Sequence, residues 1–192
     1  MNLKHLINPF SKFDEKTLLI IGIMGAFLNY IFCNLFGYIM DGNLHFRFLR
    51  EEESNITILL YILINIILLA ISLFIVGKFI NSKTRIIDII NTVLIASIPS
   101  TLLLAISEIP PFKRSMDTVQ EIALTNPESL NSLDLIIILI FSFISIIFLI
   151  YSFVLIYKGF KTATNVKNIL PKISIFVITI TLNIITQFYL LK

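Results

Sequence analysis

The sequence predicts an all-α fold, a polytopic membrane protein in which a bundle of five transmembrane helices follows a short amphipathic N-terminal segment. The first observation is composition: 57% of the 192 residues are hydrophobic and 14% are charged, whereas soluble domains have about 45–50% apolar and about 25% charged residues. The second is distribution, because the apolar residues form five runs, each long enough to cross a hydrocarbon layer of about 30 Å as a helix. Lipid is therefore the expected solvent.

The five runs set the predicted organisation of the chain. They cover residues 18–40, 56–80, 86–106, 133–157 and 169–191. None alternates polar and apolar residues as the strands of a membrane β-barrel do, and a helix satisfies its own backbone hydrogen bonds in a medium without water. Residues 18–191 are therefore expected to form one helical membrane domain.

Residues 1–17 are expected to form a head on the membrane surface. Leu3, Leu6, Ile7 and Phe10 recur at i, i+3, i+4 and i+7, the spacing of an amphipathic surface helix. Ten of the 15 Lys and Arg residues lie in this head or in and beside the second and fourth connections of the chain. Segments rich in these cations stay in the cytoplasm, so the N-terminus is expected there and the C-terminus outside.

The turn at residues 81–85 joins two long spans, which are therefore expected to be antiparallel neighbours. Lys83 and Arg85 fall at headgroup level, where each cation beside an anionic leaflet contributes about 1 kcal/mol. Asp88 follows one turn into the third span, near the positive end of the helix dipole and near Arg85. We interpret Asp88 as a helix-start acid, with a proton or ion site as the alternative.

Other polar residues lie deeper in the predicted spans. Pro99 removes one backbone hydrogen bond and predicts a kink, which either shapes packing or marks a transport site. Asn34, Asn65 and Asn91 are expected to turn inward and to bond between helices, where such bonds contribute about 0.6 kcal/mol on average. The default prediction is that these side chains hold the bundle together.

The connection before the last span is basic. Lys158, Lys161, Lys167 and Lys172 lie in or beside it, and clusters of this kind bind anionic headgroups. Membrane lipids are therefore predicted partners, through these four lysines together with Lys83 and Arg85. Simple anchoring and recognition of one lipid are both open. Gly159 sits where a helix end with positive φ is expected.

Catalytic and metal-binding signatures do not occur in the sequence. It has no HExxH, GxSxG or Walker loop and no Cys/His metal spacing. His5 and His45 fall on opposite sides of the membrane in the predicted topology, so they cannot share a metal within one chain. The protein is therefore expected not to be an enzyme, to hold no cofactor or metal, and to bind no nucleic acid.

The central hairpin resembles that of the Yip-domain family, five-span membrane proteins named for their interaction with Ypt/Rab GTPases. A Gly after an apolar run, a short basic turn, an Asp and then VLIASIPSTLLL carry the resemblance; Gly77, Asp88 and Pro99 match best. The stretch IYKGFKTATNVKNILP is similar to the loop before the family's last span. The resemblance covers residues 18–191 and implies a five-helix membrane fold.

Two departures separate the chain from the eukaryotic members of that family. FDEKTLLII stands where those members carry an Asp-Leu-Tyr-Gly-Pro motif, and Leu94 and Ile95 stand where they have Gly-Tyr. The chain therefore resembles the compact bacterial branch, which implies a bacterial cytoplasmic membrane, and GTPase binding is not carried over.

Two functions are open from the sequence. The first is a non-enzymatic, Yip-like membrane protein that organises the bilayer or scaffolds protein partners, favoured by the hairpin match and the missing catalytic signatures. The alternative is a small transporter or channel subunit that uses the kinked third span, favoured by Pro99 and the polar residues around it.

Overall fold

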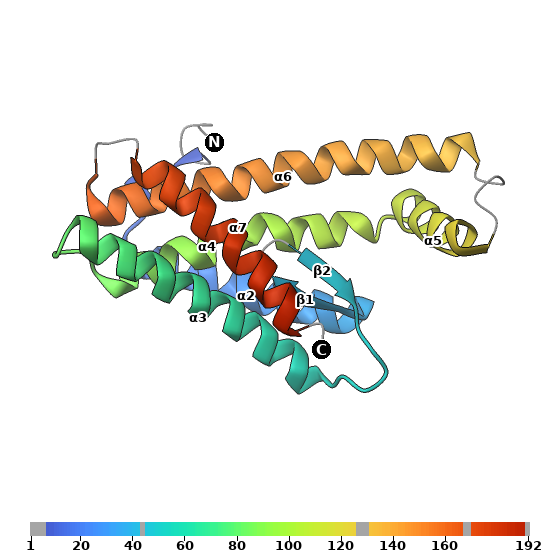
Figure 1. Ribbon diagram of the computed structural model, residues 1–192, viewed down its shortest axis with the longest axis horizontal. Helices are drawn as coiled ribbons and strands as arrows, with labels where there is room; N and C mark the ends of the chain where they lie inside the picture. Colours follow the sequence, from blue (N-terminus) through green and yellow to red (C-terminus); the bar gives the residue numbers. More distant parts are fainter. Residues whose placement is uncertain (1–6, 43–44, 126–130, 167–169, 191–192) are drawn as a thin grey trace.

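The computed structural model of the chain describes residues 7–42, 45–125, 131–166 and 170–190 (Figure 1). In chain order its elements are the 3₁₀ turn η1 (Pro9–Ser11), α2 (Glu15–Phe36), β1 (Tyr38–Gly42), β2 (His45–Phe48), α3 (Asn55–Ile80), α4 (Ile86–Ser107), α5 (Pro110–Thr125), α6 (Ser132–Thr164) and α7 (Leu170–Leu190). The fold is mostly helical, as the sequence predicts, with one small hairpin that it does not predict.

Four helices, α2, α3, α4 and α6, are long and apolar enough to cross a membrane. The predicted fifth span corresponds to α7, whose described residues include a shorter apolar stretch at Val177–Phe188. The count of five spans is therefore not confirmed, whereas several candidate spans are present.

The central helix is α4, which lies between α2 and α6 (Figure 1). Glycines on both neighbours allow this close packing. A Cβ at Gly22 of α2 would lie 2.6 Å from the Leu94 Cβ, and one at Gly159 of α6 would lie 2.4 Å from the Thr92 Oγ1. Small residues that let helix backbones approach are the usual basis of helix packing in lipid.

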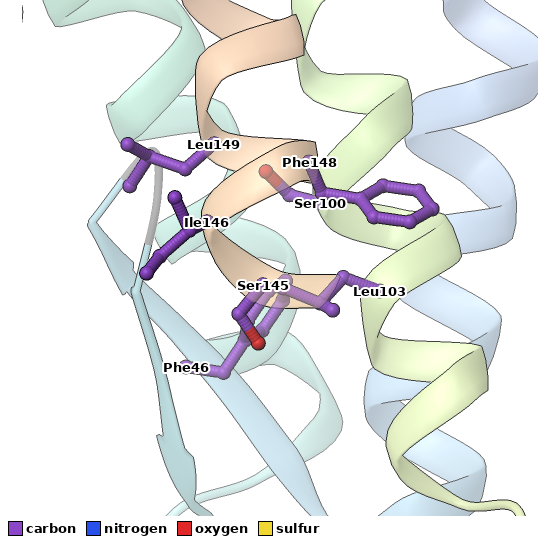
Figure 2. A pocket seen from close by; sticks show the side chains of 7 residues that line it. All are labelled: Phe46, Ser100, Leu103, Ser145, Ile146, Phe148 and Leu149. Atoms are coloured by element: carbon purple, nitrogen blue, oxygen red, sulfur yellow. The ribbon is translucent and has the colours of Figure 1, made fainter. Parts of the chain in front are cut away.

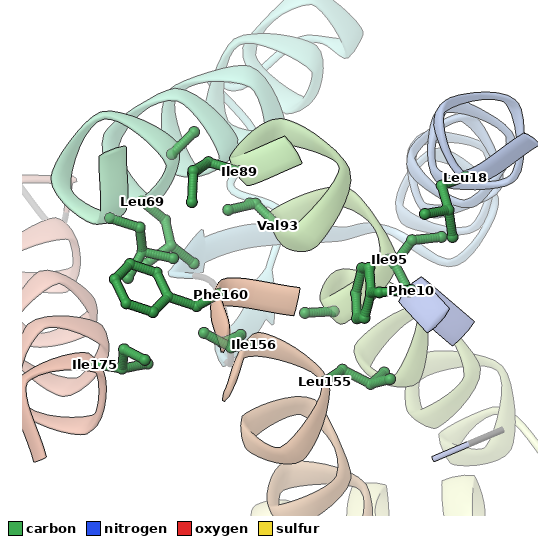
Figure 3. Close-up of a cluster of buried hydrophobic side chains, with 13 residues drawn as sticks. Phe10, Leu18, Leu69, Ile89, Val93, Ile95, Leu155, Ile156, Phe160 and Ile175 are labelled. Atoms are coloured by element: carbon green, nitrogen blue, oxygen red, sulfur yellow. The ribbon is translucent and has the colours of Figure 1, made fainter. Parts of the chain in front are cut away.

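Two clusters of buried apolar side chains follow one another along the bundle. The larger cluster joins α3, α4, α6 and α7 to η1 and α2, and its most buried members include Ile89, Val93 and Phe160 (Figure 3). The second cluster joins α2, α3 and α4 to β1, with Cys33 and Ile39 fully buried. In lipid, dense contacts of this kind stabilise the bundle by van der Waals packing.

The first span is predicted to continue to residue 40, and the structure corrects this. Here α2 ends at Phe36, because Gly37 takes a left-handed conformation with φ 71° and its N–H donates to the Cys33 carbonyl. Residues 38–40 belong instead to β1, which pairs antiparallel with β2 and packs against α2, α3 and α7. Enclosure by helices is the condition under which non-helical backbone is tolerated near lipid.

Residues 107–132 fall between the predicted third and fourth spans, and they contain the 16-residue helix α5. It packs along the start of α6: the ring centroids of Phe112 and Phe141 are 5.4 Å apart, and Ser115 Oγ donates to Asp134 Oδ1 at 2.7 Å. Together, α5 and the first turns of α6 extend beyond the other helices at one end of the molecule (Figure 1).

The end of α6 also differs from the prediction. Gly159 is an interior helical residue packed on α4, and the left-handed residue that ends α6 is Asn165, with φ 51°. In the head, residues 1–6 lie outside the described residues. In the part that is described, Ile7 is helical, the turn η1 follows at residues 9–11, and its Phe10 is buried, so the surface helix stays a prediction.

Candidate functional site

The candidate site lies where α4 begins, at the end of the bundle that also holds η1 and the start of α2. The turn between α3 and α4 is fixed there by three contacts. Arg85 Nη2 pairs with Glu15 Oε2 of α2 at 2.6 Å, Asn81 Nδ2 donates to the Thr164 carbonyl of α6 at 3.0 Å, and Thr84 Oγ1 donates to the Gly77 carbonyl at 3.0 Å. The predicted headgroup-level cation Arg85 is thus exposed and ion-paired.

Two predicted polar residues, Asp88 and Asn91, come together at this end. Asn91 is 2% exposed, and its Nδ2 donates to the main-chain carbonyl of Glu15 at 3.1 Å. Its Oδ1 is buried and has no hydrogen-bond partner. The Asp88 carboxylate is half-buried and likewise has no hydrogen-bond partner among the described residues. One buried acceptor, the Asn91 Oδ1, therefore stays unsatisfied, and the partly exposed Asp88 carboxylate lies within one turn of it on α4.

Both residues line a small cavity that we call the polar groove. Its volume is about 160 Å³ and its lining includes Phe10, Phe13, Glu15, Asp88, Asn91 and Thr162. The groove thus lies among η1, α2, α4 and α6. Two carboxylates and an amide oxygen face the same small space, an arrangement that attracts hydrogen-bond donors and positive charge.

A second cavity, which we call the apolar cleft, continues from the polar groove and shares Phe13 and Leu18 with it. Its volume is about 360 Å³, and its lining is almost wholly apolar, with Lys12 near its η1 end and Leu102 at its deep end. In Figure 3, Phe10 and Ile95 lie between Leu18 of α2 and Leu155 of α6, where the two cavities adjoin.

Pro99 lines the wall of the apolar cleft and is buried. The helix continues through it without a break, and two nearby hydroxyls bond to the backbone. Ser97 Oγ donates to the Leu94 carbonyl at 2.8 Å, and Thr101 Oγ1 lies 3.4 Å from the Ser97 carbonyl. Side chains thus supply backbone hydrogen bonds beside the missing N–H of the proline, as is usual for proline in membrane helices.

Asn65 belongs to a different site, at the hairpin. Its Nδ2 donates to the Met40 carbonyl of β1 at 2.7 Å. Asn29 of α2 completes this site: its Nδ2 donates to Thr101 Oγ1 at 3.0 Å and lies 3.6 Å from Met40 Sδ. Asn34, predicted to bond inside the bundle, is only half-buried.

Beyond these bonds, the hairpin carries a charge cluster that sequence reasoning missed. Asp41 is fully buried and accepts from His45 Nδ1 at 2.6 Å, and Arg47 binds both carboxylate oxygens of Glu53 at 2.8 and 2.5 Å. The hydrogen bond to Asp41 raises the pKa of His45, and the bond from Arg47 lowers the pKa of Glu53. The sequence signal that indicates such a hairpin is the Asp41-Gly42 pair, followed by alternating polar and apolar residues at 45–48.

A third cavity, of about 140 Å³, lies between β2, α4 and α6 (Figure 2). Its lining is apolar except for Ser100 and Ser145, and Phe46 closes it on the hairpin side. The Ser145 hydroxyl donates to the Phe141 carbonyl of its own helix. This cavity therefore offers no charged group to a ligand.

Among known protein families, the chain matches the Yip1 domain over residues 16–191. The chain belongs to the Yip1 domain family. The resemblance seen in the central hairpin is thereby confirmed. Among curated proteins and among solved structures, nothing matches the sequence significantly.

Membership of the Yip1 domain family places the chain among integral membrane proteins with several candidate spans, and that family is generally non-enzymatic. Within the described part of this Yip1 domain, no group of three or more His, Cys, Asp or Glu side chains is arranged to hold a metal ion.

The predicted basic cluster of this Yip1 domain is only partly described. Lys161 lies exposed in the last turn of α6, and Lys158 lies half-buried one turn earlier. Lys83 is exposed in the α3–α4 turn, where its N–H donates to Asn81 Oδ1. Lys167 and the side chain of Lys172 fall outside the described residues.

Proposed function

We propose that this Yip1-domain protein is a non-enzymatic scaffold that organises the bilayer or binds partner proteins within it. In this proposal, α7 is a fifth span, because 21 residues at about 1.5 Å each reach about 30 Å. The N-terminus faces the cytoplasm of a bacterial cell and the C-terminus lies outside. The excess of Lys and Arg at the end that holds the α3–α4 turn supports this orientation.

The observation that carries the proposal is the long exposed apolar surface of α6. In the most apolar 18-residue stretch of α4, 61% of residues are buried within the protein, whereas in that of α6 none are. Exposed residues such as Phe143, Ile147 and Ile150 give this half of α6 an apolar surface to present within the bilayer. A stretch of helix that buries none of its residues in its own bundle is available for lateral association.

The basic residues support a second element of the proposal, contact with anionic headgroups. Lys83 and Lys161 are exposed at the same end of the bundle as Arg85. Each such cation contributes about 1 kcal/mol beside an anionic leaflet. This contact anchors the scaffold and does not by itself select one lipid.

Site-specific photo-crosslinking in native membranes tests the scaffold. A photoreactive residue at Ile147, 64% exposed on α6, is expected to capture the same protein partners in repeated purifications. Phe27 of α2, 61% exposed, is the matched control and should capture few. Equal protein capture at both positions, or none at either, would contradict a role for α6.

A small transporter or channel subunit is the second candidate, favoured by the buried Pro99 in the apolar cleft, which adjoins the polar groove that holds Asp88. Flux through reconstituted protein decides between the two functions. Flux that Asp88→Asn abolishes would establish transport and overturn the scaffold. A sealed vesicle with both wild type and variant favours the scaffold.

A further inference from the structure

We infer that the polar groove and the apolar cleft together form a binding site for one aminophospholipid, with an ethanolamine-type headgroup in the groove and an acyl chain in the cleft. This inference goes beyond the scaffold function and does not depend on it. It rests on the unsatisfied acceptor of Asn91, on the balance of charge, and on the depth of the two cavities.

The first argument is hydrogen bonding. A buried acceptor without a partner costs about 1–3 kcal/mol, and the Asn91 Oδ1 is such an acceptor on the wall of the groove. Asn65 also leaves its oxygen unpaired, but it does not line either cavity. A ligand that carries N–H groups into the groove satisfies Asn91 and the neighbouring Asp88 at once.

The second argument is charge. Glu15 forms the salt bridge with Arg85, whereas Asp88 interacts with Arg85 through its charge alone and has no salt bridge of its own among the described residues. Lys12 is exposed and lines the adjoining end of the apolar cleft. One free anion and one free cation suit a zwitterion, with its ammonium at Asp88 and its phosphate at Lys12. An anionic headgroup would meet the carboxylates and is disfavoured.

The third argument is length. Pro99 lies eleven positions after Asp88 along α4, a distance of about 17 Å at about 1.5 Å per residue. One leaflet contributes about half of the roughly 30 Å hydrocarbon thickness. The two cavities therefore extend over the depth of one leaflet. Ile21 and Leu102 line the cleft and are partly exposed, so a chain enters sideways from the bilayer.

A lipid series tests the site without any substitution. Detergent-purified full-length protein is titrated with phosphatidylethanolamine, its mono- and dimethylated forms, phosphatidylcholine and phosphatidylglycerol of equal acyl chains, and retained lipid is counted by native mass spectrometry. Binding should weaken as N–H groups are replaced. We expect phosphatidylcholine to bind about tenfold more weakly than phosphatidylethanolamine, the effect of one charge-assisted hydrogen bond.

Two variants locate the binding. Asp88→Asn keeps the shape of the groove and should lower phosphatidylethanolamine retention about tenfold. Asp134→Asn is the matched control, because Asp134 is also the third residue of its helix but contacts Ser115 of α5, away from both cavities. This variant should retain lipid like the wild type. Leu102→Phe narrows the cleft and should weaken all lipids alike.

Three results would overturn the inference. The first is equal binding of phosphatidylethanolamine and phosphatidylcholine, the second is preference for phosphatidylglycerol, and the third is unchanged selectivity in Asp88→Asn. Glycerophosphoethanolamine, which lacks acyl chains, distinguishes a lipid from a free compound: full displacement at micromolar concentration would assign the site to a soluble amine. Failure of photo-crosslinking at α6 leaves all of these outcomes unaffected.

Discussion

Replacing Gly159 by Ala is expected to force α6 away from α4. The added Cβ would lie 2.4 Å from the Thr92 Oγ1, 2.6 Å from its Cγ2 and 2.8 Å from its Cβ. Non-bonded carbons pack at about 3.5–4.0 Å, so the two residues must separate by about 1 Å. Thr92 cannot turn away freely, because it is fully buried and its hydroxyl donates to the Asp88 carbonyl at 2.8 Å.

The magnitude follows from two opposing effects. Overpacking of a tight interface costs about 1–3 kcal/mol, and Ala stabilises a helix by about 1 kcal/mol relative to Gly. The cost is expected in the upper half of its range, because the Thr92 Cβ is fixed to the backbone and no rotamer change moves it. Gly159→Ala should therefore lower the free energy of unfolding by about 1–2 kcal/mol.

Reversible unfolding in mixed detergent micelles, followed by circular dichroism, measures this change. Ser142→Ala on an exposed face of α6 is the control and should be near neutral. In a Thr92→Gly background the steric conflict disappears, so the same Gly159→Ala change should become stabilising, and the double-mutant cycle isolates the contact. A single Gly159→Ala variant as stable as the wild type would refute close packing of α4 on α6.

Two further outcomes concern the hairpin. Asn65→Leu removes the donor to the Met40 carbonyl and leaves that carbonyl unpaired, at a cost of about 1–3 kcal/mol. A cysteine introduced at position 39 (Ile39→Cys) should then react with maleimide faster than it does when Asn65 is present. Thermal stability should be greatest between about pH 4.5 and pH 6.5, the ordinary pKa values of Glu53 and His45. Because the pKa of His45 is raised in the folded protein, the stability that its pair with Asp41 contributes is complete below pH 6.5 and is lost as the pH rises above the folded pKa. Because the pKa of Glu53 is lowered, the stability that its pair with Arg47 contributes is lost in acid. His45→Gln should therefore remove only the loss of stability at alkaline pH.

The long helices could be predicted because their apolar runs exceed what any other structure needs. The end of α3, the start of α4 and the turn between them follow from Asn81, Ser82 and Lys83, which interrupt continuous apolar sequence. The end of α2 could not be found in this way, because Tyr38, Ile39 and Met40 are as apolar as the helix before them. Their backbone conformation is decided by Gly37 and by enclosure among helices, which is a tertiary effect.

The helix α5 was missed for the opposite reason. Its apolar residues are few and its charged residues many, so hydropathy alone marks it as a connection. Pro110 at its first position is a helix-start signal that favours the observed structure. Gly159 was also misinterpreted, because a glycine near the end of a predicted span suggests a helix cap. In the structure, its lack of a side chain instead allows α6 to contact Thr92 of α4.

The candidate site was predictable in its residues and not in its shape. Asp88 and Asn91 stand out as polar groups at the start of an apolar span. Their shared groove exists because Phe10 of η1 and Phe13 after it lie against α4 and α6. The i, i+3, i+4, i+7 spacing that ends at Phe10 predicts a surface helix and does not indicate that position. Long-range packing therefore converts two ordinary helix-start residues into the wall of a cavity.

The polar residues at depth consequently divide into two kinds that experiment separates. Asn29 and Asn65 donate to side chains and backbone of other elements, so their replacement should change stability. The Asp88 carboxylate has no hydrogen-bond partner among the described residues, so Asp88→Asn should cost only its interactions with the helix dipole, about 0.3–1 kcal/mol, and with Arg85, about 0.2–0.5 kcal/mol. Because Asn65 and Asp88 share no partner, their effects on unfolding should add, while only Asp88→Asn should change which lipid is retained. Loss of lipid selectivity in Asn65→Leu at unchanged Asp88 would show that hairpin and groove are one coupled unit.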